Sequence, residues 1–406
     1  MSAGSTASSQ PLRHRPFLLY FWARVFANFS RQIVAVAVGW QVYELTKSPL
    51  HLGLVGLAQF LPTLLFTFYA GHAADRFERK RIVQICQWVD GANAAVLAWG
   101  TMAGWLDVTH IYLAAMLFGT TTAFERPASL SMLPNVVPDS MLQQSTALAS
   151  GAIQFATIGG PALGGFIYAL SPGVPYLATA VFWLLAGLLN GAVPVKRTRS
   201  TVAAPTWQSL FAGVGFVWRN PVILGTISLD LFAVLLGGAV ALLPIFASEV
   251  LHTGPLGLGL LRSAPAVGAL VVTALLARTP LQTRVGMRMF QAVIAFGLAT
   301  IVFGVSTQMW LSLLALVVMG AADEISVVIR LSLVQLQTPD DMRGRVSAVN
   351  FLFVNASNQL GEFESGVVAA LVGAVPAVLI GGVGSVLIAL LWMRLFPSLR
   401  NLERLA

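Results

Sequence analysis

Long apolar stretches alternate with short polar connections along the whole 406-residue chain. About 20 apolar residues in a helix, at a rise of 1.5 Å per residue, cover the roughly 30 Å hydrocarbon core of a bilayer. Twelve stretches reach or approach this length, so the pattern predicts an all-helical integral membrane protein. The predicted spans are residues 17–43, 50–73, 80–103, 111–133, 142–169, 176–195, 222–251, 256–277, 289–306, 310–336, 346–372 and 378–395.

A polar segment divides these spans into two sets of six. Residues 196–206 are rich in basic and small polar side chains, and residues 207–218 are apolar with tryptophans near both ends. Such a tryptophan-flanked segment is typical of a helix that lies in the membrane interface. We predict an N-terminal tail (1–16), a six-helix bundle (17–195), a cytoplasmic linker with an interfacial segment (196–220), a second six-helix bundle (221–396) and a C-terminal tail (397–406).

Composition supports the membrane assignment. Hydrophobic residues make up 57% of the chain and charged residues only 10%, whereas soluble domains carry about 25% charged residues. The formal net charge of +8 reflects sidedness, because eighteen of the 24 Lys and Arg residues fall in connections or termini on one side, and only Lys47 falls on the other. By the positive-inside rule that side, with both termini, is cytoplasmic. A nucleic-acid partner is not expected.

The connection at 71–81 carries a motif. It resembles the loop between helices 2 and 3 of the major facilitator superfamily, G-x-x-x-D-R-x-G-R-[RK]. The matching residues are Gly71, Asp75, Arg76, Arg79 and Lys80. Glu78 stands where the family motif has glycine. The resemblance implies a conformational gate, in which Asp75 holds the two bundles together by facing a helix N-terminus near Arg345.

The two halves repeat at a spacing near 202 residues. Residues 138–141 (Pro-Asp-Ser-Met) recur at 339–342 (Pro-Asp-Asp-Met), and Gly119 recurs as Gly320. The pair Gly56 and Pro62 recurs in the same way as Gly259 and Pro265. A half-length repeat is typical of transporters built from two bundles, which bind substrate between the repeats near the middle of the membrane.

A second motif lies in the fifth span. Residues 160–165 resemble the antiporter motif G-P-x-x-G-G of the same superfamily, which is associated with exporters, through Gly160, Pro161, Gly164 and Gly165. The alternative is a generic face of small residues that lets two membrane helices approach closely.

About twelve ionisable residues fall well inside the predicted spans. An ionisable group in hydrocarbon costs about 2.5–3.5 kcal/mol on insertion scales, so such residues face the bundle interior and mark a pathway or pair with one another. The twelve are Arg24, Arg31, Asp90, Glu125, Arg126, Asp230, Arg262, Asp323, Glu324, Arg330, Glu362 and Glu364. Arg24, Asp90, Arg262 and Arg330 lie nearer the span ends and are expected to pair locally or to extend toward the interface.

The remaining eight are the candidate transport residues. For proton coupling we select the acids Asp230, Glu362, Glu364, Asp323 and Glu324, with Glu362 first because the repeat places it opposite Pro161. For the substrate cavity or charge pairing we select Arg31, Glu125 and Arg126. Because Glu125 and Arg126 point about 100° apart on a helix, we expect them to contact different neighbours.

Other chemistry has little support. The five histidines show no metal-ligand spacing, and the chain contains no G-x-x-x-x-G-K-[ST] phosphate-binding loop. We therefore expect no metal, no cofactor and no enzymatic activity. The single cysteine, Cys86, is expected to be a small buried apolar residue.

The segments 39–46 and 52–56 look like the bacterial branch of the superfamily that includes the enterobactin exporter and related efflux proteins. This resemblance implies a monomeric secondary transporter in the bacterial cytoplasmic membrane. Its partners would be protons, the lipid bilayer and a small, partly apolar substrate, drug-like or siderophore-like, moved outward by alternating access. Uptake or facilitated diffusion by the same fold, and a non-transporting membrane receptor, remain alternatives.

Overall fold

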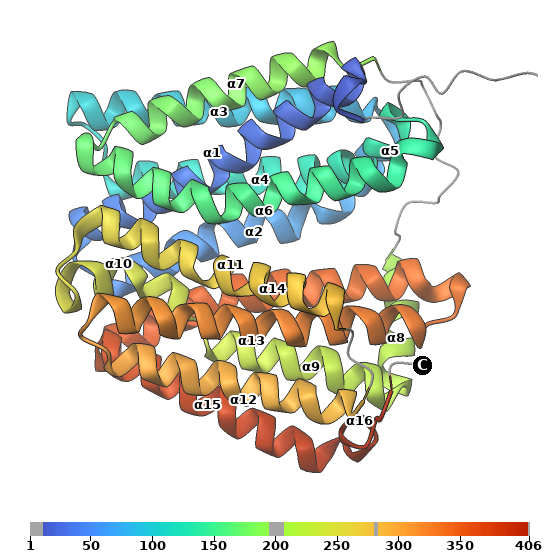
Figure 1. Cartoon of the computed structure of the whole chain (residues 1–406). Coiled ribbons are helices and arrows are strands. Elements are labelled where there is room, and N and C mark those ends of the chain that lie inside the picture. Colours follow the sequence, from blue (N-terminus) through green and yellow to red (C-terminus); the bar gives the residue numbers. More distant parts are fainter. Residues whose placement is uncertain (1–10, 195–206, 280–282, 405–406) are drawn as a thin grey trace, which may run out of the picture. The chain divides into compact units, whose positions relative to one another are not determined.

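The computed structural model describes residues 11–194, 207–279 and 283–404, and all regular structure in these ranges is helical (Figure 1). The predicted linker at 196–206 and the first ten residues of the predicted N-terminal tail lie outside the described residues. The elements are η1 (Pro11–Arg13), α1 (Arg15–Thr46), α2 (Pro49–Arg76), α3 (Arg79–Ala103), α4 (Val108–Leu130), α5 (Leu133–Val136), α6 (Asp139–Leu170), α7 (Val174–Ala192), α8 (Trp207–Arg219), α9 (Pro221–Leu236), η2 (Ala239–Leu242), α10 (Leu243–Ile245), the π-helical turn η3 (Phe246–Val250), α11 (Gly254–Arg278), α12 (Val285–Val305), α13 (Met309–Leu336), α14 (Asp340–Val372), α15 (Ala374–Leu395) and α16 (Pro397–Arg400).

Eight stretches of the described chain are long and apolar enough to cross a membrane. They are Pro49–Phe66 of α2, Pro221–Val250, and the helices α6, α7, α11, α12, α13 and α15. Four further helices, α1, α3, α4 and α14, have 23 to 33 residues but contain more polar side chains. Together with the eight they account for the twelve predicted spans.

Close contacts divide the chain into two compact units. Unit 1 comprises Met1–Ala37 and Leu61–Ala204, and unit 2 comprises Val38–Phe60 and Pro205–Ala406. In unit 1, α3 packs along α4 and α7, and Phe118 of α4 stacks on Trp183 of α7 with ring centroids 5.2 Å apart. In unit 2, α11 packs along α13 and α12 along α15 (Figure 1). Both cores consist mainly of aliphatic and aromatic side chains.

The sequence repeat corresponds to a repeat in local structure. Helices α6 and α14 both begin after an extended proline, Pro138 or Pro339, whose carbonyl accepts the amide N–H three residues later at 2.9 Å. In unit 1 the carbonyl of Gly119 on α4 accepts the Thr63 hydroxyl of α2 at 3.0 Å. In unit 2 the corresponding Gly320 of α13 packs against Pro265 of α11. The two halves therefore place equivalent residues at equivalent helix contacts.

The seventh predicted span, 222–251, is wrong as a single helix. Helix α9 ends at Leu236, and the chain continues through η2, α10 and η3 to Val250. The break occurs at Gly237 and Gly238, where a Cβ on Gly238 would lie 2.6 Å from the Gly361 carbonyl oxygen. Pro244 follows and lacks the amide N–H that would continue the helical hydrogen bonding. All these residues are apolar, so hydrophobicity alone could not indicate the break.

The predicted C-terminal tail is partly folded against unit 2. It contains α16, whose Leu399 is fully buried, and Gly286 at the start of α12 donates its N–H to the Leu402 carbonyl at 3.0 Å. The segment predicted to lie in the membrane interface forms helix α8. The prediction for Cys86 is confirmed, because its side chain is buried.

Candidate functional site

A buried polar network in unit 1 is centred on Glu125 of α4. Its carboxylate forms an ion pair with Arg31 of α1 and accepts a hydrogen bond from the amide of Gln87 on α3 at 2.9 Å. Gln87 in turn accepts a hydrogen bond from Asn190 of α7 at 2.8 Å. The Glu125 side chain is only 4% exposed, so these contacts compensate a charge held away from water.

Glu125 and Arg126, adjacent on α4, differ in their exposure. Glu125 is buried, whereas Arg126 is exposed at the surface of unit 1. Arg24 lies on the same face of α1 as Arg31 and donates a hydrogen bond to Ser129 of α4. Asp90 is buried on α3 and accepts a hydrogen bond from Thr121 of α4.

The central ion pair of unit 2 joins Asp230 of α9 to Arg330 of α13. Both side chains are buried, at 6% and 4% exposure. Asp230 was predicted as a deep acid for proton coupling, and Arg330 was expected to pair locally or reach the interface. The structure shows that the two residues pair with each other across one hundred positions of sequence.

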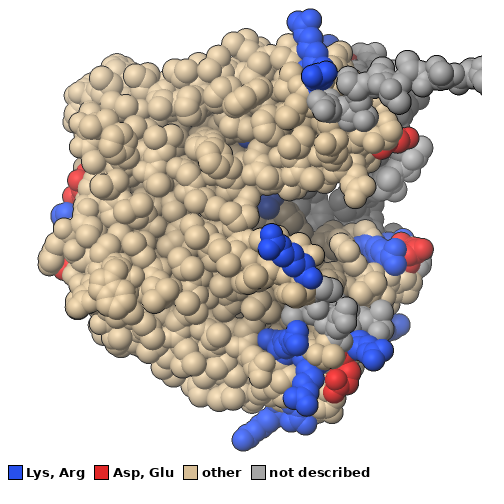
Figure 2. Space-filling view, viewed as in Figure 1, with Lys and Arg blue, Asp and Glu red and all other residues tan. Residues whose placement is uncertain are grey.

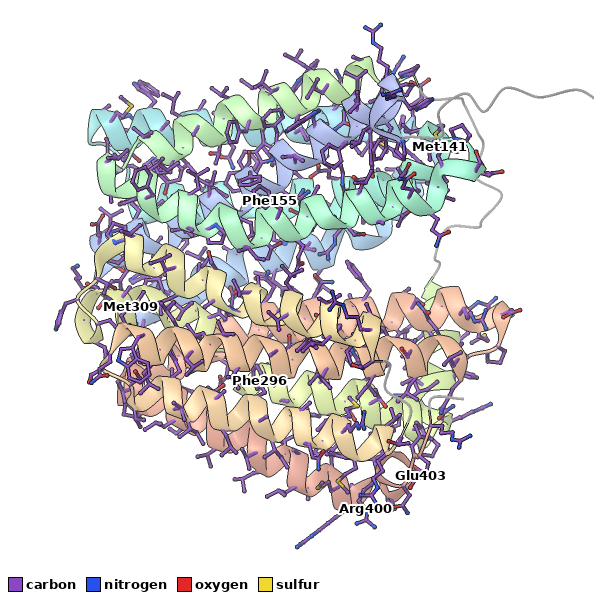
Figure 3. The ribbon with its side chains drawn as sticks, viewed as in Figure 1. Met141, Phe155, Phe296, Met309, Arg400 and Glu403 are labelled. Atoms are coloured by element: carbon purple, nitrogen blue, oxygen red, sulfur yellow. The ribbon has the colours of Figure 1, made fainter. Side chains whose placement is uncertain are left out.

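A small cavity in unit 2 lies beside this pair. It is lined by Asp230, Asp323 and Ser326, together with apolar side chains that include Phe296 of α12 (Figure 3). The Ser326 hydroxyl is buried and has no hydrogen-bond partner among the described residues. The structure thus brings two of the predicted acids, Asp230 and Asp323, to one small and mainly apolar cavity.

The other predicted acids occupy separate positions in unit 2. Glu324 accepts a hydrogen bond from Thr273 of α11 at 3.0 Å, and Ser365 lies 3.4 Å from Glu364. Glu362 interacts electrostatically with Arg262 of α11. Glu362 also packs against Gly56 of α2, where an added Cβ would lie 2.8 Å from a carboxylate oxygen.

The antiporter-like motif forms a close helix contact within unit 1. A Cβ on Gly160 would lie 2.5 Å from the Gln32 Cβ of α1, and a Cβ on Gly164 would lie 3.0 Å from the Ile33 Cα. Pro161 and Gly165 are buried in the same helix, α6. These contacts are those of a small-residue packing face, and they bring α6 against the part of α1 that carries Arg31.

The basic residues of the signature connection bind the ends of neighbouring helices. Arg79 donates to the Ser131 carbonyl after α4 at 3.3 Å, and Lys80 donates to the Val193 carbonyl after α7 at 2.9 Å. Cations are stabilising at helix C-termini, where carbonyls lack intrahelical partners. Arg76 ends α2 and is exposed. The predicted roles of Gly71 and Asp75 concern side chains outside what the structure describes.

The backbone conformation of Glu78 explains why this position of the motif accepts a residue other than glycine. Its backbone has φ −63° and ψ 114°, an extended conformation open to any residue. It precedes α3, its carbonyl accepts the Arg81 N–H at 2.8 Å, and its carboxylate pairs with the Arg81 side chain at 2.8 Å.

Several polar contacts were not predicted from the sequence. The amides of Gln87 and Asn190 were missed because uncharged residues were not considered as candidates. The Tyr43 hydroxyl donates to Glu249 of the π-helical turn η3, within unit 2. Glu249 lies near the end of the predicted span 222–251 and was not selected as a candidate.

Comparison with known proteins identifies the family. A family model described as transmembrane secretion effector matches residues 6–405. The chain belongs to this family. The family match and the curated relatives show that this chain is a multi-pass membrane transporter of the major facilitator superfamily, and not an enzyme.

Curated relatives align over nearly the full length of this family member. It is 26% identical to the enterobactin exporter EntS of Citrobacter koseri over 399 residues, which cover 96% of this chain and 94% of the exporter. It is 28% identical to the multidrug efflux pump Tap of Mycobacterium tuberculosis over 408 residues, covering 96% and 95%. Both relatives are exporters by name.

Solved structures show the fold. The crystal structure of a bacterial homologue of the human lysosomal transporter Spinster has a TM-score of 0.73 at 13% identity, with 98% of this chain and 99% of that chain covered. The nucleoside transporter NupG has a TM-score of 0.72 at 17% identity, with coverage of 94% and 100%. The predicted twelve-span major facilitator architecture is confirmed.

Proposed function

We propose that this transporter exports a small, partly apolar molecule from a bacterial cell in exchange for protons, by alternating access. Export is supported by the two named relatives, an exporter and an efflux pump. Proton exchange is supported by the ion pair between Asp230 and Arg330, which is the observation that carries the proposal. The gating role of Asp75 belongs to the same proposal.

The pair offers a physical route to coupling. Arginine stays protonated throughout, whereas a carboxylate can exchange its arginine partner for a proton. Asp323 borders the same cavity and can pass a proton to or from Asp230. When Asp230 is protonated, the attraction that holds α9 to α13 weakens, and this helix pair can adopt a second packing. The pairing favours Asp230 as the coupling acid over Glu362, the first choice from sequence.

Proton exchange can be measured in everted membrane vesicles that are acidified by respiration and contain a pH-sensitive dye. Adding a transported compound, with enterobactin and ethidium as the first probes, should raise the internal pH, because each molecule taken up drives protons out. The variant Asp230→Asn/Arg330→Met removes the exchangeable proton without leaving a buried charge. It should abolish this pH change and retain downhill movement of the compound.

Glu362→Gln and vesicles without the transporter are the controls. Substrate-linked proton release by the double variant would refute the role of Asp230, and its loss in Glu362→Gln alone would assign coupling to Glu362. Downhill movement without any pH change in the unmodified protein would indicate a facilitator. Absence of flux with every compound would favour a receptor.

Sidedness gives a second test. In unit 2, Figure 2 shows Lys and Arg side chains gathered at the end that carries α16 and the connection between α11 and α12. Arg278, Arg284 and Arg400 are among the exposed residues there. By the positive-inside rule this end is cytoplasmic. The connection before α3 should lie on the same side, and Lys47 on the opposite side.

In a Cys86→Ala background, cysteines introduced at Arg81 and Lys47 should therefore react with a membrane-impermeant maleimide from opposite sides. Arg81 is chosen because its side chain is 70% exposed, whereas Arg79 and Lys80 bind helix ends. Intact cells should label only the Lys47→Cys variant, and everted vesicles only Arg81→Cys. Labelling of both variants in intact cells would overturn the proposed orientation.

A further inference from the structure

An open groove, the α1–α7 groove, lies between these two helices on the surface of unit 1 (Figure 1). Its volume is about 510 Å³, within the range of about 300–1,000 Å³ typical of small-molecule sites. The two helices meet beside it through Phe26 and Phe182, whose ring centroids are 5.3 Å apart. The groove is lined by Arg15, Leu18, Leu19, Trp22, Phe26 and Leu189. It is therefore apolar along its length, with one charged group at the end where α1 begins.

The spacing of residues on α1 produces this groove. Its α1 residues fall at positions i, i+3, i+4, i+7 and i+11, so they form one stripe along the helix. Trp22 within the stripe is exposed, and so are the neighbouring Leu185 and Leu188 of α7. Because α1 and α7 both cross the bilayer, exposed apolar side chains on this surface contact hydrocarbon. The α1–α7 groove therefore opens toward the lipid.

The length of the α1–α7 groove matches one leaflet of the membrane. Arg15 is the first residue of α1, and Phe26 lies eleven residues further along the helix. At a rise of 1.5 Å per residue the stripe is about 16 Å long, and half of the hydrocarbon core is about 15 Å thick. An acyl chain in the groove would thus reach from the membrane surface to about the middle of the bilayer, with its headgroup beside Arg15.

The charged end of the groove suits an anion. No acidic residue occurs before Glu44 or between Asp139 and Asp230, so α7 and the first half of α1 contain none. The Arg15 side chain is exposed and forms no hydrogen bond or ion pair with any described residue. Arg13 is also exposed, in the short helix η1 just before α1. A guanidinium group presents several N–H donors that match the oxygens of a phosphate.

We propose that the α1–α7 groove binds an anionic phospholipid, with one acyl chain along the α1 stripe and the phosphate at Arg15. Charge complementarity selects the headgroup, and an apolar lining as long as one leaflet selects a lipid over a soluble anion. A basic residue near a membrane surface contributes about 1 kcal/mol toward anionic lipid, which corresponds to about 5-fold in affinity. The lipid site uses none of the residues proposed for export or proton coupling.

Native mass spectrometry of the purified full-length protein in detergent tests this preference. Phosphatidylglycerol and phosphatidylcholine with identical acyl chains are titrated separately, and the one-to-one complexes are measured. Phosphatidylglycerol should bind about 5-fold more tightly, since only its headgroup has a net negative charge. Arg15→Gln should remove this difference, and Arg15→Lys should retain it. Because Arg15 is exposed, Arg15→Gln without lipid should unfold at the same temperature as the unmodified protein.

Two further variants separate the groove from the rest of the surface. Leu189→Trp adds bulk to the apolar wall, so it should weaken the binding of both lipids by a similar factor. Arg394→Gln is the matched control for Arg15→Gln, because Arg394 is an exposed arginine in the last turn of α15, outside the groove. It should leave the preference for phosphatidylglycerol unchanged.

Several results would overturn the lipid site. Equal binding of the two lipids by the unmodified protein would indicate only unselective lipid contact, and a preference that survives Arg15→Gln would place the anion elsewhere. Unchanged binding in Leu189→Trp would exclude the groove as the position of the chain. Displacement of phosphatidylglycerol by millimolar glycerol 3-phosphate would indicate a site for a soluble anion instead. A protein dimer without bound lipid would mean that a second copy covers the groove.

Discussion

Replacing Asp230 with asparagine should destabilise the protein by about 3–5 kcal/mol, the cost of breaking a buried ion pair by removal of one partner. Both side chains of the pair with Arg330 are almost fully buried. Arginine cannot release its proton in a protein, so the variant retains an uncompensated guanidinium. Arg330→Met should cost less, because the remaining carboxyl can bind a proton and become neutral. Unfolding by denaturant in detergent would measure both.

The double variant Asp230→Asn/Arg330→Met is the internal control for this effect. It leaves no buried charge, so its free energy of unfolding should lie close to that of the unmodified protein, which makes the two substitutions strongly non-additive. Two results would show that the pair does not hold charge away from water. One is an equal loss of unfolding free energy in the two single variants, and the other is a loss in the double variant that equals their sum.

The sequence could identify Asp230 as important but could not provide its partner. A carboxylate in an apolar span is visible in the residue pattern, because hydrocarbon penalises it. Asp230 and Arg330 are one hundred residues apart, and their pairing depends on how α9 packs against α13. It also depends on how each helix is rotated about its axis, which an apolar sequence does not determine. The same applies to Glu125, whose partners come from α1 and α3.

The fold was easier to predict from the sequence than the site, because bilayer thickness sets the length of each span. Predicted boundaries agree with the helices within a few residues for most elements, for example 310–336 against Met309–Leu336. The failure at Gly237 and Gly238 has a clear cause, since a break stabilised by close backbone contact with α14 leaves hydrophobicity unchanged. Motif matching had a similar limit: the glycines at 160 and 164 were noted, but their contact with α1 came only from the structure.

The last prediction concerns a close contact between two long helices of unit 2. Helices α11 and α13 meet at two glycines, where a Cβ on Gly320 would lie 2.0 Å from the Pro265 carbonyl oxygen and a Cβ on Gly268 would lie 1.9 Å from the Val317 carbonyl oxygen. Backbone atoms cannot move aside as a side-chain end can. Gly320→Ala should therefore force the two helices apart and destabilise the protein by about 1–3 kcal/mol or more.

Gly344→Ala provides the matched comparison for the same chemical change. Gly344 lies in α14 of the same unit, and a Cβ there would meet no atom within 4 Å. Alanine at an unhindered helical position stabilises by about 0.4–1 kcal/mol, because the unfolded chain loses conformational freedom. The midpoint of thermal unfolding in detergent should therefore fall for Gly320→Ala and rise for Gly344→Ala. Shifts of the same sign would mean that α11 and α13 are not in the close contact on which the repeat of Gly119 and Gly320 depends.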